Sequence, residues 1–141
     1  MINLPEGVDL NELLLFLRNI GLQSSNILRD FENGSISLYD SSENLHPIID
    51  TKDPVTAADL AINKLVKDAF LIKYPNLSWG MITEEDSKNV LFNSCKSEWV
   101  WLVDPLDGTK DFIQKTGEYA VHVGLIFKNK PILGMVVLPR S

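Results

Sequence analysis

The chain has 141 residues, 45% of them hydrophobic, a formal net charge of −6 and a pI of about 4.8. This length supports one hydrophobic core and is too short for two comfortable domains, so we treat residues 1–141 as a single domain. The acidity argues against a nucleic-acid polymer or an anionic membrane surface as a partner, and it suits the binding of cations.

Apolar stretches and cysteine content bear on location. The longest apolar runs, such as residues 13–17 and 120–127, fall far short of the roughly 20 residues that span a bilayer. The N-terminus shows no secretory pattern, and the single Cys95 has no partner within the chain for a disulfide. We therefore expect a cytoplasmic protein with no membrane span.

The first predicted element is a long amphipathic helix from about Asp9 to Phe31. Asp9 and Glu12 have the spacing of a capping box, in which the two side chains satisfy free N–H groups of the first turn. The apolar period then places one set of residues on the buried face: Leu10, Leu13, Leu14, Leu17, Gly21 and Leu28. This helix is expected to serve packing, not chemistry.

A second helix is predicted to open at Thr56 and to stop near Pro75, because the residue before a proline avoids helical geometry. Thr56 and Asp59 form another capping box, and Val55 and Leu60 occupy the positions of a hydrophobic staple. Capping is thus a complete structural explanation for Asp59. A catalytic role for it needs independent support.

Alternating or continuous apolar patterns predict the strands. They cover residues 77–81, 99–103, 120–127 and 132–138, with residues 32–50 forming a loop or short hairpin. A hairpin at residues 128–131 joins the last two strands, and both are apolar enough to be central. Together these elements predict an α+β fold, with two long helices packed on a largely antiparallel sheet of about five or more strands.

The most informative stretch is Asp104-Pro105-Leu106-Asp107-Gly108-Thr109, directly after the apolar run 99–103. We expect Asp104 to end the strand, and Pro105 and Gly108 to form a turn that returns Asp107 and the Leu106 carbonyl toward the same point. Carboxylate and carbonyl oxygens are the ligands that Mg²⁺ prefers. Asp-Pro and Asp-Gly are also ordinary turn dipeptides, so either alone would indicate only a loop.

Further acids follow the strand at residues 77–81. Glu84, Glu85 and Asp86 are typical of solvated surface, but they also place carboxylates at a second strand end. A short helix or turn is predicted at residues 110–113, and the amides before it would point toward an anion. His122, within an apolar strand, is interpreted as a core or face histidine and not as a ligand.

These motifs resemble those of the inositol monophosphatase superfamily of lithium-sensitive, Mg²⁺-dependent phosphatases. The hexapeptide Asp104 to Thr109 matches the family's Asp-Pro-(Ile/Leu)-Asp-Gly-Thr signature throughout, and residues 54–59 match Pro-Val-Thr-x-x-Asp. Glu84 and Glu85 correspond to the Glu-Glu of a Gly-Glu-Glu motif, with Thr83 in place of the usual glycine. The resemblance implies a small phosphorylated substrate and Mg²⁺ as the cofactor.

The resemblance also implies roles for individual residues. One Mg²⁺ would be held by Glu84, Asp104 and the Leu106 carbonyl, and a second by Asp104 and Asp107. Asp59 and Thr109 would orient the attacking water as the catalytic pair. The groups expected to contact substrate are Glu84, Leu106, Asp107, Gly108 and Thr109, the last two through amides that cradle the phosphoryl oxygens.

Within the superfamily, Lys110-Asp111-Phe112 after the signature resembles the bacterial 3′(2′),5′-bisphosphate nucleotidases, because inositol monophosphatases usually have Thr-x-Asn-Phe here. The implied reaction converts 3′-phosphoadenosine 5′-phosphate to AMP and phosphate, in sulfur assimilation. Inositol monophosphatase is the first alternative. A truncated, catalytically silent metal-binding domain is the second.

The resemblance covers the N-terminal half of a layered α/β/α/β/α fold. The family's Trp-Asp-x-Ala motif, whose Asp binds the second metal, is not present in these residues. We therefore expect the chain either to lack a C-terminal half or to form a homo-oligomer. Alone, it is expected to bind one Mg²⁺ weakly and to be a poor phosphatase.

Overall fold

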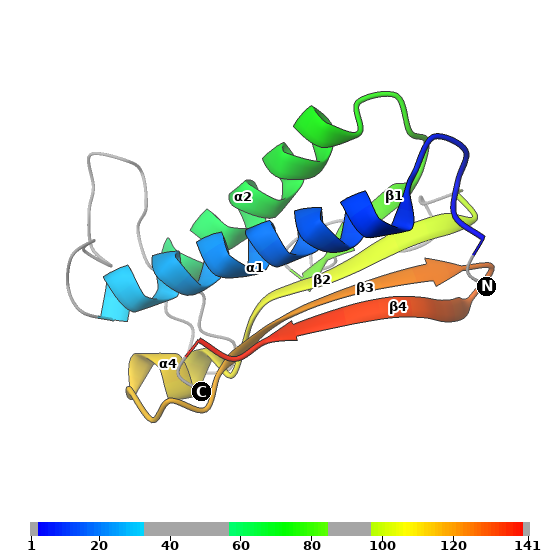
Figure 1. Cartoon of the computed structure of the whole chain (residues 1–141). Helices are drawn as coiled ribbons and strands as arrows, with labels where there is room; N and C mark the ends of the chain where they lie inside the picture. The colour runs from blue at the N-terminus through cyan, green and yellow to red at the C-terminus, as the bar shows by residue number, and fades with distance from the viewer. Residues whose placement is uncertain (1–2, 33–56, 85–96, 140–141) are drawn as a thin grey trace.

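The structure is a computed structural model, and it describes residues 3–32, 57–84 and 97–139. These residues form helices α1 (Leu10–Glu32), α2 (Ala57–Lys73) and α4 (Thr109–Ile113), and strands β1 (Gly80–Thr83), β2 (Trp99–Asp107), β3 (Ala120–Phe127) and β4 (Lys130–Val137). Figure 1 shows α1 and α2 side by side over one face of the sheet, with α4 at its end. The predicted α+β class is confirmed, whereas the predictions for residues 33–56 and 85–96 lie outside the described part.

The sheet has the strand order β1-β2-β3-β4. β1 runs parallel to β2, while the β2–β3 and β3–β4 pairings are antiparallel. The expectation of central strands therefore holds for β3 but not for β4, which lies at an edge of the described sheet. Its Pro131, which has no N–H to donate, suits an edge position. The predicted hairpin is confirmed as a tight turn, with Lys128 and Asn129 at φ 49° and 67°.

Helix α1 begins where the capping pattern predicted. The backbone N–H of Glu12 donates to Asp9 Oδ2 at 3.0 Å. Leu13, Leu17 and Leu28 are buried as expected, but Leu14 is 47% exposed. Leu14 lies at the margin of the packed stripe and borders a hollow between α1 and β4. No helix in the described ranges is long and apolar enough to cross a membrane.

Aromatic side chains join α2 to the sheet. The ring of Phe70 lies 4.8 Å from that of Trp101 on β2, and Trp79 packs edge-on against Trp101 and against Tyr74 at the end of α2. The predicted strand at residues 77–81 is displaced in the structure, where β1 begins at Gly80 and continues to Thr83. Trp79 packs against aromatic rings, and the pairing with β2 starts only at Gly80.

Glycine allows α1 to lie close to β4. A Cβ at Gly21 would be 3.0 Å from Val137 Cγ2, tighter than ordinary contacts. The buried apolar core lies between the helices and this face of the sheet: Leu13, Leu17, Ile20, Leu28, Phe31, Ile62, Val66, Phe70, Trp101, Val103, Leu106, Val121, Val123 and Leu125. The opposite face of the sheet carries the polar residues described next.

Candidate functional site

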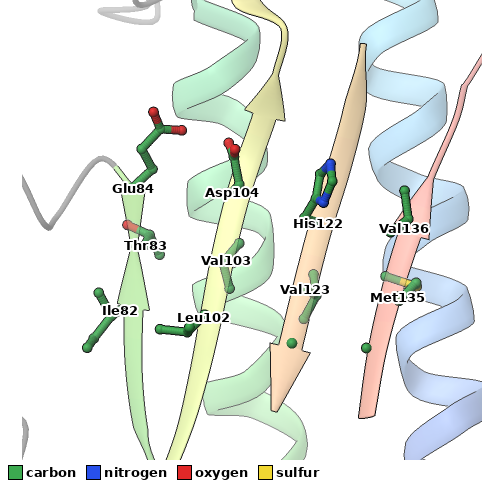
Figure 2. Close-up of a pocket in the computed structure, with 12 residues that line it drawn as sticks. Ile82, Thr83, Glu84, Leu102, Val103, Asp104, His122, Val123, Met135 and Val136 are labelled. Carbon is green, nitrogen blue, oxygen red and sulfur yellow. The ribbon is translucent and has the colours of Figure 1, made fainter. Parts of the chain in front are cut away.

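Two acidic residues follow the paired part of β1 and β2. Thr83 lies opposite Val103 in the parallel pair, so the residues that follow are Glu84 and Asp104. β3 extends this row, because Asp104 lies opposite His122. Figure 2 shows the side chains of Glu84, Asp104 and His122 on the same side of the sheet. Three neighbouring strands therefore contribute a polar row on the face away from α1 and α2.

A hollow of about 520 Å³ lies beside this row. Its polar lining comes from Glu84, Asp104 and His122, and most of the remainder is apolar strand surface. Gly124 and Gly134 are opposite each other in the β3–β4 pair and leave the floor free of side chains there. The volume falls within the range of about 300–1,000 Å³ that is usual for small-molecule sites.

The hexapeptide continues strand β2 and does not end it. We expected Asp104 to be the last strand residue, but β2 runs to Asp107. Its register shifts between Asp104, opposite His122, and Asp107, opposite Ala120. Three steps along β2 thus match two steps along β3, which is a β-bulge. The extra residue places Asp104 and Asp107 on the same face, whereas regular alternation would place them on opposite faces.

The bulge explains how a proline sits inside this strand. Pro105 lies beyond the last paired residue of β1 and inside the register shift with β3, so its missing N–H removes no ladder hydrogen bond. The next N–H, that of Leu106, donates to Asp104 Oδ1 at 3.3 Å. This bond restrains the Asp104 carboxylate and leaves its second oxygen for another partner.

Gly108 connects β2 to α4 in a left-handed conformation. Its φ is 85°, as the turn prediction required. A Cβ here would lie 2.7 Å from the carbonyl oxygen of Glu118, so only glycine fits without movement of the neighbouring backbone. The predicted short helix is confirmed as α4, which starts at Thr109.

The Thr109 side chain is turned back onto the strand. Its Oγ1 donates to the Leu106 carbonyl oxygen at 3.1 Å. A carbonyl oxygen has two lone pairs and a hydroxyl can also accept. Both predicted site groups therefore keep the capacity for one further interaction.

Asp59 lies in the first turn of α2 and is 2% exposed. A carboxylate with so little contact with water is costly unless polar or cationic groups compensate for it. This burial distinguishes Asp59 from an ordinary helix-capping residue at the surface. The capping box itself is not tested, because Thr56 lies outside the described residues.

Comparison with known proteins gives the family. The family model described as "Inositol monophosphatase family" matches residues 11–141. The chain belongs to this family. The resemblance inferred from the Asp104 to Thr109 signature is therefore confirmed over nearly the whole sequence.

Curated relatives of this inositol monophosphatase family member are named "3'(2'),5'-bisphosphate nucleotidase CysQ". The protein of Escherichia coli (strain K12) is 34% identical over 120 residues, which cover 83% of this chain and 47% of the relative. That of Haemophilus influenzae is 31% identical over 141 residues, covering 99% of this chain and 46% of the relative. The chain thus spans about half the length of the curated relatives it matches.

Solved structures agree on the fold. The extragenic suppressor protein suhB from Bartonella henselae superposes with a TM-score of 0.70 at 22% identity, over 91% of this chain and 45% of that one. Inositol monophosphatase II from Staphylococcus aureus MSSA476 gives 0.64 at 23% identity, over 91% and 42%. These likenesses support the inositol monophosphatase fold and cover only part of each neighbour.

The chemical type of the candidate ligand atoms in this family member is suited to a hard cation. Glu84, Asp104, Asp107 and the Leu106 carbonyl supply oxygen ligands, which Mg²⁺ prefers. Within residues 3–32, 57–84 and 97–139, no three His, Cys, Asp or Glu side chains gather into a ready metal-binding group. The individual ligand assignments therefore stay predictions.

His122 is the residue that sequence reasoning undervalued. Of the predicted core or face position, the structure shows the face position: the His122 side chain is 45% exposed, and its Nε2 lies 3.4 Å from Asp107 Oδ2. Because side chains alternate along β3, His122 lies on the face of the sheet opposite to the buried Val121 and Val123. What the sequence could not supply was the register that brings Asp104 and Asp107 beside it.

Proposed function

We propose that the protein acts as a Mg²⁺-dependent phosphomonoesterase on 3′-phosphoadenosine 5′-phosphate, releasing phosphate and leaving AMP. The observation that carries this proposal is the placement of Glu84, directly after β1, beside Asp104 on the neighbouring strand β2, with Asp107 brought to the same face by the bulge. The names of the curated relatives support the bisphosphate nucleotide as substrate. Cytoplasmic location, sulfur assimilation and lithium sensitivity belong to the same proposal.

The proposed metal ligands are the oxygens of Glu84, Asp104, Leu106 and Asp107. A bound Mg²⁺ would offset the negative charge of the phosphate and make water a better nucleophile. The bond from the Leu106 amide holds the Asp104 carboxylate in one orientation before any ligand arrives. The turn geometry at Gly108 fixes where α4 lies relative to the end of β2.

The remaining groups act on water and phosphate. We assign Asp59 and the Thr109 hydroxyl to orienting the attacking water, since either can accept its proton in a hydrogen bond. The amides of Gly108 and Thr109 are assigned to the phosphoryl oxygens. Because phosphoryl transfer depends mainly on positioning and charge stabilisation, no nucleophilic side chain is required.

Metal binding is tested by calorimetric titration of the 141-residue chain with Mg²⁺. Asp104→Asn keeps the shape of the side chain and removes its charge, so we expect affinity to fall on the order of 10-fold or more. Asp68→Asn is the matched control, because Asp68 lies on the exposed side of α2 in an ion pair with Lys64. Equal affinities for the two variants would remove Asp104 from the site.

The reaction is tested by phosphate release from 3′-phosphoadenosine 5′-phosphate and from inositol 1-phosphate. The assay compares the 141-residue chain with the longest natural chain that contains it. We expect the nucleotide to be the better substrate and lithium to inhibit. The reverse preference would favour an inositol monophosphatase, and Mg²⁺ binding without phosphate release from either chain would indicate a silent metal-binding domain.

A further inference from the structure

His122 stands between two hollows on the open face of the sheet. The first, of about 520 Å³, contains Glu84 and Asp104 in its lining, and the second, of about 430 Å³, contains Asp107 and Glu118. His122 lines both. Among the described residues of the two linings, its imidazole is the one basic group beside four carboxylic acids. His122 is therefore the described basic side chain that could restrain one of these carboxylates.

The partner of His122 is Asp107. Its Oδ2 lies 3.4 Å from His122 Nε2, and the two side chains are 62% and 45% exposed. The bulge creates this proximity, because Asp107 pairs opposite Ala120, two residues before His122 on the same face of β3. An exposed Asp side chain is otherwise free to change rotamer, whereas an imidazole N–H this close to one carboxylate oxygen can restrain the carboxylate.

We propose that His122 is a positioning residue that holds the Asp107 carboxylate in the orientation needed to bind the metal cation. The inference rests on the proposed function of the site. His122 contacts the Oδ2 of Asp107. The other carboxylate oxygen, Oδ1, therefore stays available for the cation. Groups that orient metal-binding carboxylates typically contribute about 10- to 100-fold in affinity. Because both side chains are partly exposed, we expect an effect at the lower end, about 10-fold.

The test compares three variants of the 141-residue chain with the wild type by calorimetric Mg²⁺ titration at fixed pH. His122→Ala removes the donor and should weaken binding about 10-fold, whereas His122→Gln restores an N–H donor of similar reach and should recover most of that loss. Leu102→Ala is the control for shortening a side chain on the same face, since Leu102 also lines the first hollow. It should bind Mg²⁺ within about 2-fold of the wild type. Circular dichroism shows that each variant is folded.

A second readout detects the contact itself without any ligand. Long-range ¹H–¹⁵N spectra of the imidazole should show the Nε2–H tautomer in the wild type, and Asp107→Ala should change the tautomer populations. The chain has two histidines, so a His46 variant assigns the signals.

The outcomes separate the inference from the proposed function. If the wild type and His122→Ala bind Mg²⁺ equally well, the positioning role is overturned and the proposed site is retained. Equal losses in His122→Ala, His122→Gln and Leu102→Ala indicate general disturbance of the strand and also overturn it. Wild-type chain that binds no Mg²⁺ overturns the proposed function, and the inference with it, whatever the spectra show.

Discussion

Replacing Gly108 with alanine should destabilise the protein more than the same change at Gly7. The two glycines have nearly the same backbone, with φ of 85° and 86°. A left-handed alanine costs about 1–2 kcal/mol at either place. At Gly108 the new Cβ would also lie 2.7 Å from the Glu118 carbonyl oxygen, while at Gly7 it meets no described atom within 4 Å. Crowding of this kind adds about 1–3 kcal/mol, giving a total of about 2–5 kcal/mol for Gly108→Ala.

The measurement is urea denaturation of both variants, followed by tryptophan fluorescence, to which the buried Trp101 contributes. The free energy of unfolding should fall by about 1–2 kcal/mol in Gly7→Ala, which serves as the matched control for the strained φ. The difference between the two variants then isolates the contact with Glu118. Equal losses of unfolding free energy in the two variants, with an unchanged dependence on urea, would refute the reasoning that Gly108 packs closely against the Glu118 backbone.

Two further predictions concern tyrosines. Tyr119→Phe removes the hydroxyl that donates to Glu32 Oε2 at 2.5 Å and should lower stability by about 1–2 kcal/mol; an unchanged melting temperature would contradict this. Burial first, and then the charges of Glu12 and Asp9, raise the pKa of Tyr74 above 10.0. The folded state then holds the phenolic proton more tightly than the unfolded state. The stability that this difference contributes is fully present below pH 10 and is lost as pH rises through the raised pKa of Tyr74. Absorbance titration should show the Tyr74 pKa lowered in Glu12→Gln, and an identical titration curve would count against the charge effect.

Sequence patterns predicted helix α1 and the β3–β4 hairpin, because both are determined by residues that are close together in the chain. The cap at Asp9 and the apolar period fixed the start and the buried face of α1, because both act within a few turns. The hairpin between β3 and β4 followed from its short polar turn. Leu14 was wrongly assigned to the buried face. Periodicity shows which direction the apolar face of a helix points, but not how wide a strip of that face is covered by the sheet.

Long-range pairing accounts for what the sequence did not reveal. Asp-Pro and Asp-Gly indicate a turn in isolation, and only the register of β3 shows that the strand continues to Asp107. The same register brings His122 beside Asp107, which no spacing in the chain predicts. The acids of the candidate site could thus be proposed from the sequence, while their mutual placement depends on strands far apart along the chain.

The β-bulge in β2 has a consequence for the thermodynamics of ligand binding. Site residues on a loop must be ordered when a ligand arrives, at a cost of about 1–2 kcal/mol for each backbone position that becomes fixed. Asp104 and Asp107 are instead parts of a paired strand, with the intervening residues held at both ends of the register shift. Their backbone freedom is lost during folding, so a cation or a phosphate ester that bound at the proposed site would meet acids whose main chain is already in place. The amides on either side of the bulge should accordingly exchange with solvent at rates governed by opening of the sheet, with or without ligand.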